Sequence, residues 1–238
     1  MIFHTTCDEL YFYRFYENFW KSIRKYNPEA NFSLNYVGSK NDEIINFCKE
    51  NKIILSIEET TLKDLEQKFT RSVYREILGY YPLCRWKSIP LVDETVIVCD
   101  VDMLAIGKID IDFIEELLKK YQAVNITRIK PDGTHGGTLL IALSKQSIIS
   151  VKPMAEAYSQ SLTDEIFIGE DLNVRNFIYE SLDVYHLNNK VLDLSKPKYS
   201  YNGEWFVFAK GGRGEHSLKK IERLTNHLEI LRNNKFID

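Results

Sequence analysis

Asp100 stands directly after the clearest strand that the sequence predicts, Thr95–Cys99, and Asp102 follows two residues later. An uninterrupted apolar run of this length is typical of a strand that is buried on both faces of a sheet. Ligands of open α/β sheets bind beyond the carboxyl ends of the strands, which is where these aspartates stand. If the chain stays extended for one more step, both carboxylates point to one side about 6.6 Å apart, and a divalent cation such as Mg²⁺ or Mn²⁺ can bind between them.

A second Asp-x-Asp follows shortly after, at Asp110-Ile111-Asp112. It precedes the apolar positions of a helix expected over Asp112–Lys120. Side-chain oxygens at the start of a helix accept hydrogen bonds from its first backbone amides. We therefore interpret Asp112 as a helix cap and the first pair as the functional one.

The elements around the first pair alternate between strands and helices. Strands are expected at Ile2–Thr6, Phe32–Val37, Ile53–Ile57, Thr95–Cys99, Ala123–Thr127, Thr138–Leu143, Val184–Leu187 and Trp205–Phe208. Helices are expected from an Asp8 cap to just before Pro28, at Asp42–Asn51, from Pro82 onward, and at Asp112–Lys120, Gln146–Tyr158, Asp171–Glu180 and Ser217–Asn233. Such alternation predicts an α/β fold with a Rossmann-like, mostly parallel sheet and helices on both faces.

Composition narrows the class of protein. The 238 residues are 44% apolar and 27% charged, which predicts one globular domain over residues 1–238. The net charge of −3, with basic residues spread along the chain, does not favour a nucleic-acid partner. The four cysteines are far apart in sequence, so we expect buried thiols rather than a disulfide framework.

The chain carries no segment typical of membrane insertion. Its first residues lack a basic region followed by an apolar stretch, and no apolar run reaches about 18 residues, so we expect a cytoplasmic protein without a transmembrane segment. Peripheral contact with a membrane stays open. The cationic side chains of Lys219, Lys220 and Arg223 are expected on a solvated helix face.

The segment Val96-Ile97-Val98-Cys99-Asp100-Val101-Asp102 resembles the metal-binding strand of GT-A nucleotide-sugar transferases, nearest to the glycogenin and lipopolysaccharide galactosyltransferase (family 8-like) group. The resemblance implies a glycosyltransferase that moves a hexose from a uridine diphosphate sugar to a hydroxyl of a saccharide acceptor. It also implies that Asp100, Val101 and Asp102 hold Mn²⁺ or Mg²⁺ and the donor. Residues implied to contact the donor elsewhere are Thr5, Thr6, Asp8, Tyr11 and Arg85.

Later segments add further candidates. His135-Gly136-Gly137 keeps the small residues that let a sugar approach closely. Gly169-Glu170-Asp171 resembles a stretch of inverting galactosyltransferases, which implies Asp171 as the catalytic base and Glu170 as its neighbour. The likeness to the family 8-like group implies a donor-side carboxylate there instead, so retention and inversion both stay open. The glycine-rich turn between Lys210 and His216 offers backbone amides to a diphosphate, together with Lys210 and Arg213. The resemblance implies His216 as a third metal ligand.

Two other functions remain open at this point. Haloacid-dehalogenase-type phosphatases also carry an Asp-x-Asp after an apolar strand, although theirs usually follows the first strand, whereas here 99 residues precede Asp100. The third reading is a domain that binds a nucleotide-sugar without turning it over. Donor hydrolysis separates this reading from the transferase.

Overall fold

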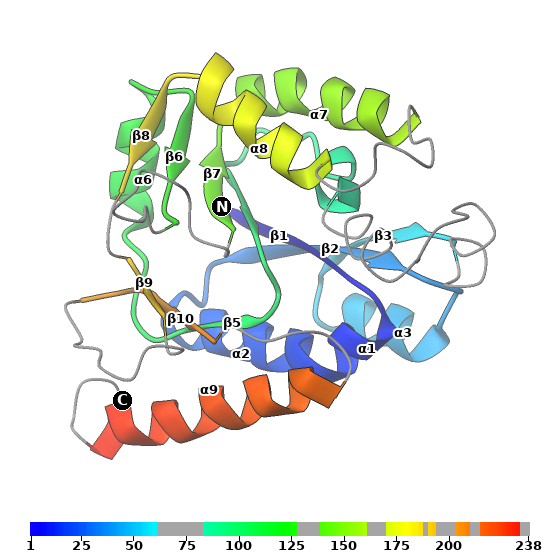
Figure 1. Cartoon of the computed structure of the whole chain (residues 1–238), viewed down its shortest axis with the longest axis vertical. Coiled ribbons are helices and arrows are strands. Elements are labelled where there is room, and N and C mark those ends of the chain that lie inside the picture. Colours follow the sequence, from blue (N-terminus) through cyan, green and yellow to red (C-terminus); the bar gives the residue numbers. More distant parts are fainter. Residues whose placement is uncertain are drawn as a thin grey trace.

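The computed structural model describes residues 1–60, 83–127, 139–160, 170–187, 190–193, 203–209 and 215–233. Figure 1 shows a large sheet with α7 and α8 along one side and α1, α2 and α9 along the other. A small second sheet lies beside the large one. None of the helices in these ranges is long and apolar enough to cross a membrane.

The first 60 residues build two successive strand–helix units, as the alternation predicted. Strand β1 (Ile2–Cys7) leads into α1 (Glu9–Tyr11), a π-helical turn η1 (Phe12–Tyr16) and α2 (Glu17–Tyr26). Asp8 caps the start of this helical run by accepting a hydrogen bond from the Tyr11 amide at 3.0 Å. Strand β2 (Asn31–Val37), α3 (Asp42–Glu50) and β3 (Ile54–Glu58) follow.

The remaining elements complete both sheets. Residues 83–87 are helical. The other strands are β4 (Val96–Cys99), β5 (Met103–Ala105), β6 (Ala123–Asn125), β7 (Leu140–Leu143), β8 (Val184–His186), β9 (Val191–Asp193) and β10 (Phe206–Phe208). The other helices are α6 (Ile111–Leu118), α7 (Lys145–Gln160), α8 (Glu170–Ser181) and α9 (Glu215–Asn233).

The large sheet is mostly parallel, which confirms the predicted α/β class. Its strand order is β3-β2-β1-β4-β7-β6-β8, and only β7 runs against its neighbours. The carboxyl ends of the six other strands therefore meet at one edge. The small sheet has the order β5-β10-β9, with β10 antiparallel to β5 and parallel to β9.

Alternate residues of the central strands pack into cores on opposite faces of the large sheet. On β4, Ile97 and Cys99 join the core on the side of α2 and α9, while Val96 and Val98 join the core on the side of α7 and α8. This double burial explains why the run is apolar at every position. The four cysteines are buried and form no disulfides.

Two sequence interpretations need correction. The cap of α6 is Asp110, whose side chain accepts a hydrogen bond from the Phe113 amide at 3.0 Å, and Asp112 lies inside the first turn. Lys220 is not solvated, because its exposed fraction is only 7%. The short strands β5 and β9 were not predicted, since strands of three residues carry too little periodicity to detect.

Candidate functional site

Asp100 follows the last residue of β4 and is held by partners from two other segments. One carboxylate oxygen, Oδ1, forms an ion pair with the guanidinium of Arg85. The other, Oδ2, accepts a hydrogen bond from the Leu139 amide at 2.7 Å, and the Asp100 amide donates to the Leu139 carbonyl at 3.1 Å. These contacts fix the carboxylate of Asp100 at the edge where the parallel strands end.

Arg85 is itself positioned by a buried histidine of β1. The His4 ring contacts the Arg85 carbonyl through Nε2 at 2.8 Å and the Ser33 hydroxyl through Nδ1 at 3.0 Å. A carbonyl only accepts, so Nε2 carries the proton and donates it, and Nδ1 accepts from Ser33. Burial lowers the pKa of His4 to about 4. Neutral His4 therefore ties the 83–87 helix to the sheet and brings Arg85 to Asp100.

The chain bends between Asp100 and Asp102 rather than continuing as one strand. Residues 101 and 102 form this bend, and Met103 then begins β5 in the small sheet. The carboxylate of Asp102 forms an ion pair with Lys220 of α9. The side chains are 17% and 8% exposed, respectively. The two aspartates thus join different partners, although each lies near the other.

The electrostatics of Asp102 reflect this crowded setting. Burial raises the pKa of Asp102 above its usual range, the attraction of Lys220 opposes that rise, and the negative charge of Asp100 adds to it. A positive charge beside this carboxylate, such as the ammonium of Lys220, therefore stabilises its ionised form.

The two aspartates suit a divalent cation. The ammonium of Lys220 is already paired with the carboxylate of Asp102, so this carboxylate binds a positive charge in the fold. Carboxylate oxygens are hard ligands, and each keeps a further lone pair after one hydrogen bond. No group of three or more His, Cys, Asp or Glu side chains gathers within the described ranges.

A hollow of about 310 Å³ lies next to the carboxyl ends of β1, β2 and β3. Asp8, Tyr36 and Asn41 line it with Gly38 and Thr60. Nearby, at the end of β1, the hydroxyls of Thr5 and Thr6 are buried without a hydrogen-bond partner among the described residues. This edge of the sheet therefore combines an open hollow with polar groups.

The structure brings some of the predicted residues to this edge and leaves others undescribed. Several predicted residues lie at the carboxyl ends of β1 and β4 or contact residues there. They are Thr5, Thr6, Asp8, Arg85, Asp100, Val101 and Asp102. Tyr11 is buried, and its ring packs 4.9 Å from the ring of Phe15. His135, Gly136, Gly137, Lys210 and Arg213 lie outside the described residues.

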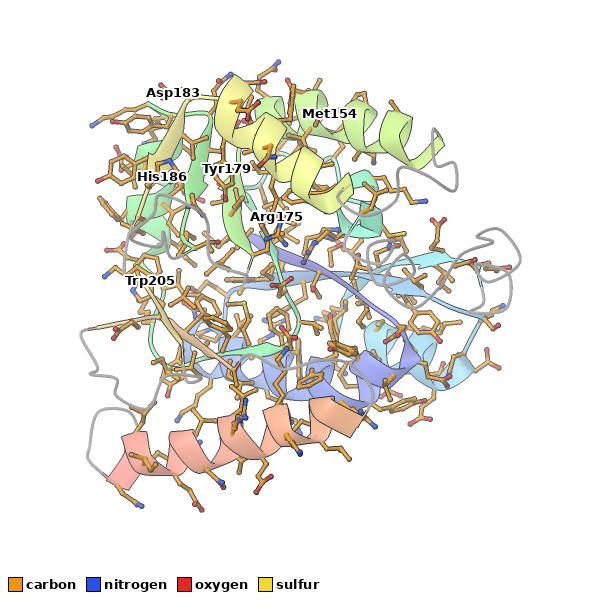
Figure 2. All side chains as sticks on the ribbon, viewed as in Figure 1. Met154, Arg175, Tyr179, Asp183, His186 and Trp205 are labelled. Atoms are coloured by element: carbon orange, nitrogen blue, oxygen red, sulfur yellow. The ribbon has the colours of Figure 1, made fainter. Side chains whose placement is uncertain are left out.

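The helices α8 and α9 carry three more candidates in their first turns. Glu170 and Asp171 begin α8, and residue 216 stands second in α9, one turn before Lys220; the side chains of all three lie outside the description. In Figure 2, Arg175 lies on the side of α8 that faces the central sheet. Arg175 is one turn beyond Asp171 on the same helix.

Lys220 is the cationic partner of Asp102 that the sequence interpretation missed. The Lys219-Lys220 pair looks like any polar helix face, and nothing local distinguishes its two members. One signal was present, because Lys220 and Leu224 are four residues apart and Leu224 is an apolar anchor of α9.

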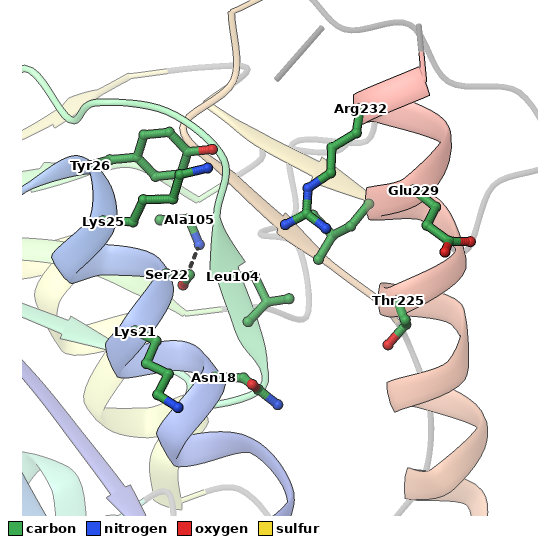
Figure 3. A pocket seen from close by; sticks show the side chains of 11 residues that line it. Asn18, Lys21, Ser22, Lys25, Tyr26, Leu104, Ala105, Thr225, Glu229 and Arg232 are labelled. Atoms are coloured by element: carbon green, nitrogen blue, oxygen red, sulfur yellow. Dashed lines mark hydrogen bonds between the residues drawn. The ribbon is translucent and has the colours of Figure 1, made fainter. Parts of the chain in front are cut away.

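A pocket farther along α9 contains none of the candidate residues. It has a volume of about 350 Å³ and lies between α2, β5 and the second half of α9 (Figure 3). The Ala105 amide donates to the Ser22 hydroxyl at 2.9 Å on one side of it, and Arg232 lines the other side. This pocket is separate from the edge that carries Asp100.

The mostly parallel seven-stranded sheet with its helices matches the GT-A glycosyltransferase fold. The chain is similar to the galactosyltransferase LgtC, crystallised with donor and acceptor sugar analogs, with a TM-score of 0.52 and 12% identity over 95% of this chain and 94% of that one. An active-site mutant of LgtC gives a TM-score of 0.53 at the same identity and coverage. The predicted fold is thus confirmed. No protein-family model matches the sequence, and no curated protein matches it either.

Proposed function

We propose that the protein is a glycosyltransferase that moves a hexose from a uridine diphosphate sugar to a hydroxyl of a saccharide acceptor. The observation that carries the proposal is the pair Asp100 and Asp102 at the carboxyl edge of a GT-A sheet, with both carboxylates held by cationic side chains. The fold supports this reaction, since the galactosyltransferase with the same fold was crystallised with donor and acceptor sugar analogs.

The proposed donor follows the edge of the large sheet. The nucleotide base occupies the hollow at the ends of β1, β2 and β3, near Thr5, Thr6, Asp8 and the backbone of Tyr11. The diphosphate lies at Asp100 and Asp102, with Lys210 and Arg213 as further candidates for its charge. Ligands of open α/β sheets bind at such an edge, beyond the carboxyl ends of the strands.

The proposed cation is Mn²⁺ or Mg²⁺, held by Asp100 and Asp102, with His216 as the candidate third ligand. When bound, the ion supplies positive charge to the diphosphate that leaves. Arg85 keeps the Asp100 carboxylate in place for this role, and His4 keeps Arg85 in place. A sugar approaches closely at His135, Gly136 and Gly137, and Asp171, with Glu170 beside it, is the candidate base that takes the proton of the acceptor hydroxyl.

The geometry disfavours the phosphatase alternative. A nucleophilic aspartate attacks phosphorus with a carboxylate oxygen, and the contacts of Asp100 with Arg85 and with the Leu139 amide lower the nucleophilicity of both its oxygens. Asp100 also follows β4 rather than the first strand of the chain.

A thermal-shift panel tests the donor assignment. A ligand that binds only the folded state at a hundredfold excess over its dissociation constant stabilises the protein by about 2.7 kcal/mol. We expect a uridine diphosphate sugar with Mn²⁺ to raise the melting temperature, and uridine alone to raise it far less. A folded protein that shows no shift with any nucleotide-sugar would contradict the assignment. For a donor that raises the melting temperature, an assay of nucleotide release then distinguishes an enzyme, which releases the nucleotide, from a domain that only binds the donor.

A further inference from the structure

Among the described residues, four charged side chains that are at most 20% exposed meet at the proposed donor site, and their formal charges sum to zero. Asp100 and Asp102 contribute two negative charges, and Arg85 and Lys220 contribute two positive ones. A divalent cation added alone leaves two positive charges uncompensated in a partly buried setting, which is costly. A divalent cation added with a diphosphate leaves the site close to neutral. Cation binding and diphosphate binding should therefore favour each other.

The two internal cations differ in how firmly they are held. Arg85 is fixed at both ends, since its guanidinium pairs with Asp100 and its backbone carbonyl accepts from His4. Lys220 reaches Asp102 from α9 through a flexible four-carbon stem. Its ammonium also lies 5.9 Å from the centre of the Phe15 ring, a weaker contact. Lys220 holds its carboxylate through one compact ammonium on a flexible stem, so it can leave Asp102 without moving α9.

We propose that Lys220 is an internal counter-ion that occupies Asp102 in the ligand-free protein and transfers to the diphosphate when the donor and a divalent cation bind. Lys220 then has two effects. It weakens metal binding in the absence of nucleotide, because the ion must displace it from Asp102. It strengthens nucleotide binding once the metal is present, because the released ammonium pairs with the phosphate oxygens. This inference rests on the proposed donor site.

Mn²⁺ binding without nucleotide tests the first effect. Removing the competing ammonium in Lys220→Gln should tighten Mn²⁺ binding by roughly tenfold, within the usual range of couplings between sites, as measured from the signal of unbound Mn²⁺ by electron paramagnetic resonance. Lys220→Met keeps the volume of the stem beside Phe15 and should behave alike. Lys219→Gln, a change on the exposed neighbour, should bind Mn²⁺ as the wild type does.

Titration with UDP tests the second effect. In the presence of Mn²⁺, both Lys220 variants should bind UDP more weakly than the wild type, whereas Lys219→Gln should not. The wild type alone provides a further check. UDP should increase the affinity of the protein for Mn²⁺, after the binding of Mn²⁺ to free UDP has been subtracted. Melting curves establish that each variant is folded before its affinities are compared.

The outcomes separate this inference from the proposed function. Equal Mn²⁺ affinity in the wild type and in a folded Lys220 variant would overturn the counter-ion role. If neither variant folds, the absence of any UDP effect on Mn²⁺ binding to the wild type would overturn it. Tighter Mn²⁺ binding in Lys220→Gln together with no UDP binding by any form would support the displacement of Lys220 but reject the donor and the transfer of the ammonium to it.

Discussion

The chain carries the same pattern twice, and the two copies have different surroundings. Asp100 and Asp102 follow a strand buried on both faces, and buried cations from two distant segments reach them. Asp110 and Asp112 are exposed at the start of α6, where Asp110 caps the helix. Because both motifs have the same Asp-x-Asp pattern, the comparison shows that the chemistry of the motif depends on the side chains that the fold places beside it.

The largest expected effect is on turnover, and it should separate the two pairs. Asp102→Asn removes a charge from the proposed cation site while nearly preserving shape, so we expect transfer to fall by at least about 10²-fold. Asp112→Asn should leave transfer near the wild-type rate. Rates measured at saturating donor for both folded variants provide the test, and equal losses would show that the wrong pair was chosen.

Acid should weaken the histidine contact that helps to position Asp100 beside Asp102, but it should not weaken the structure around Asp110 and Asp112. The pKa of His4 is about 4 in the folded protein and 6.5 in its unperturbed state, so protons bind the unfolded chain more readily. The stability that neutral His4 provides is complete above about pH 6.5 and is lost as the pH falls towards 4, about 3 kcal/mol in all.

Denaturant titrations at several pH values measure this loss. Other groups titrate in the same range, so the comparison is between the wild type and His4→Asn. We expect the wild type to lose more stability than the variant between pH 6.5 and 4. Parallel losses in the two proteins would mean that His4 does not stay neutral when the protein is folded.

A smaller effect is expected at the cap of α6. Asp110→Ala removes the acceptor of the Phe113 amide, and the loss of such a cap costs about 1 kcal/mol. The melting temperature should fall while donor affinity stays unchanged. Asp112→Ala, the matched control one residue inside the helix, should cost less. A larger loss at Asp112 would restore the sequence interpretation that it is the cap.

The sequence was informative where a pattern is local and repeated. The alternation of strands and helices predicted most elements of the large sheet, and the apolar run before Asp100 predicted a strand buried on both faces. The prediction of Asp112 as the cap of α6 was wrong because sequence signals locate the start of a helix only to within one or two residues, and Asp110 stands two residues earlier.

The contacts between distant segments were not predictable. The pair of Lys220 with Asp102 joins α9 to the start of β5, and the ring of His4 joins β1 to the 83–87 helix. Such contacts depend on how helices pack against the sheets, and a single sequence holds no periodic trace of that packing. The bend at residues 101 and 102 was not predicted for the same reason, since the pairing of β5 with β10 redirects the chain there.

A crystal structure with a uridine diphosphate sugar analogue and Mn²⁺ tests the central claim most directly. The account predicts anomalous scattering from Mn²⁺ beside Asp102, the base in the hollow at the ends of β1, β2 and β3, and the diphosphate between them. The surface hollow bordered by Asp110, Asp112 and Lys190 serves as the internal control and should stay without metal and nucleotide. Metal and nucleotide at Asp110 and Asp112, with none at Asp102, would contradict the account.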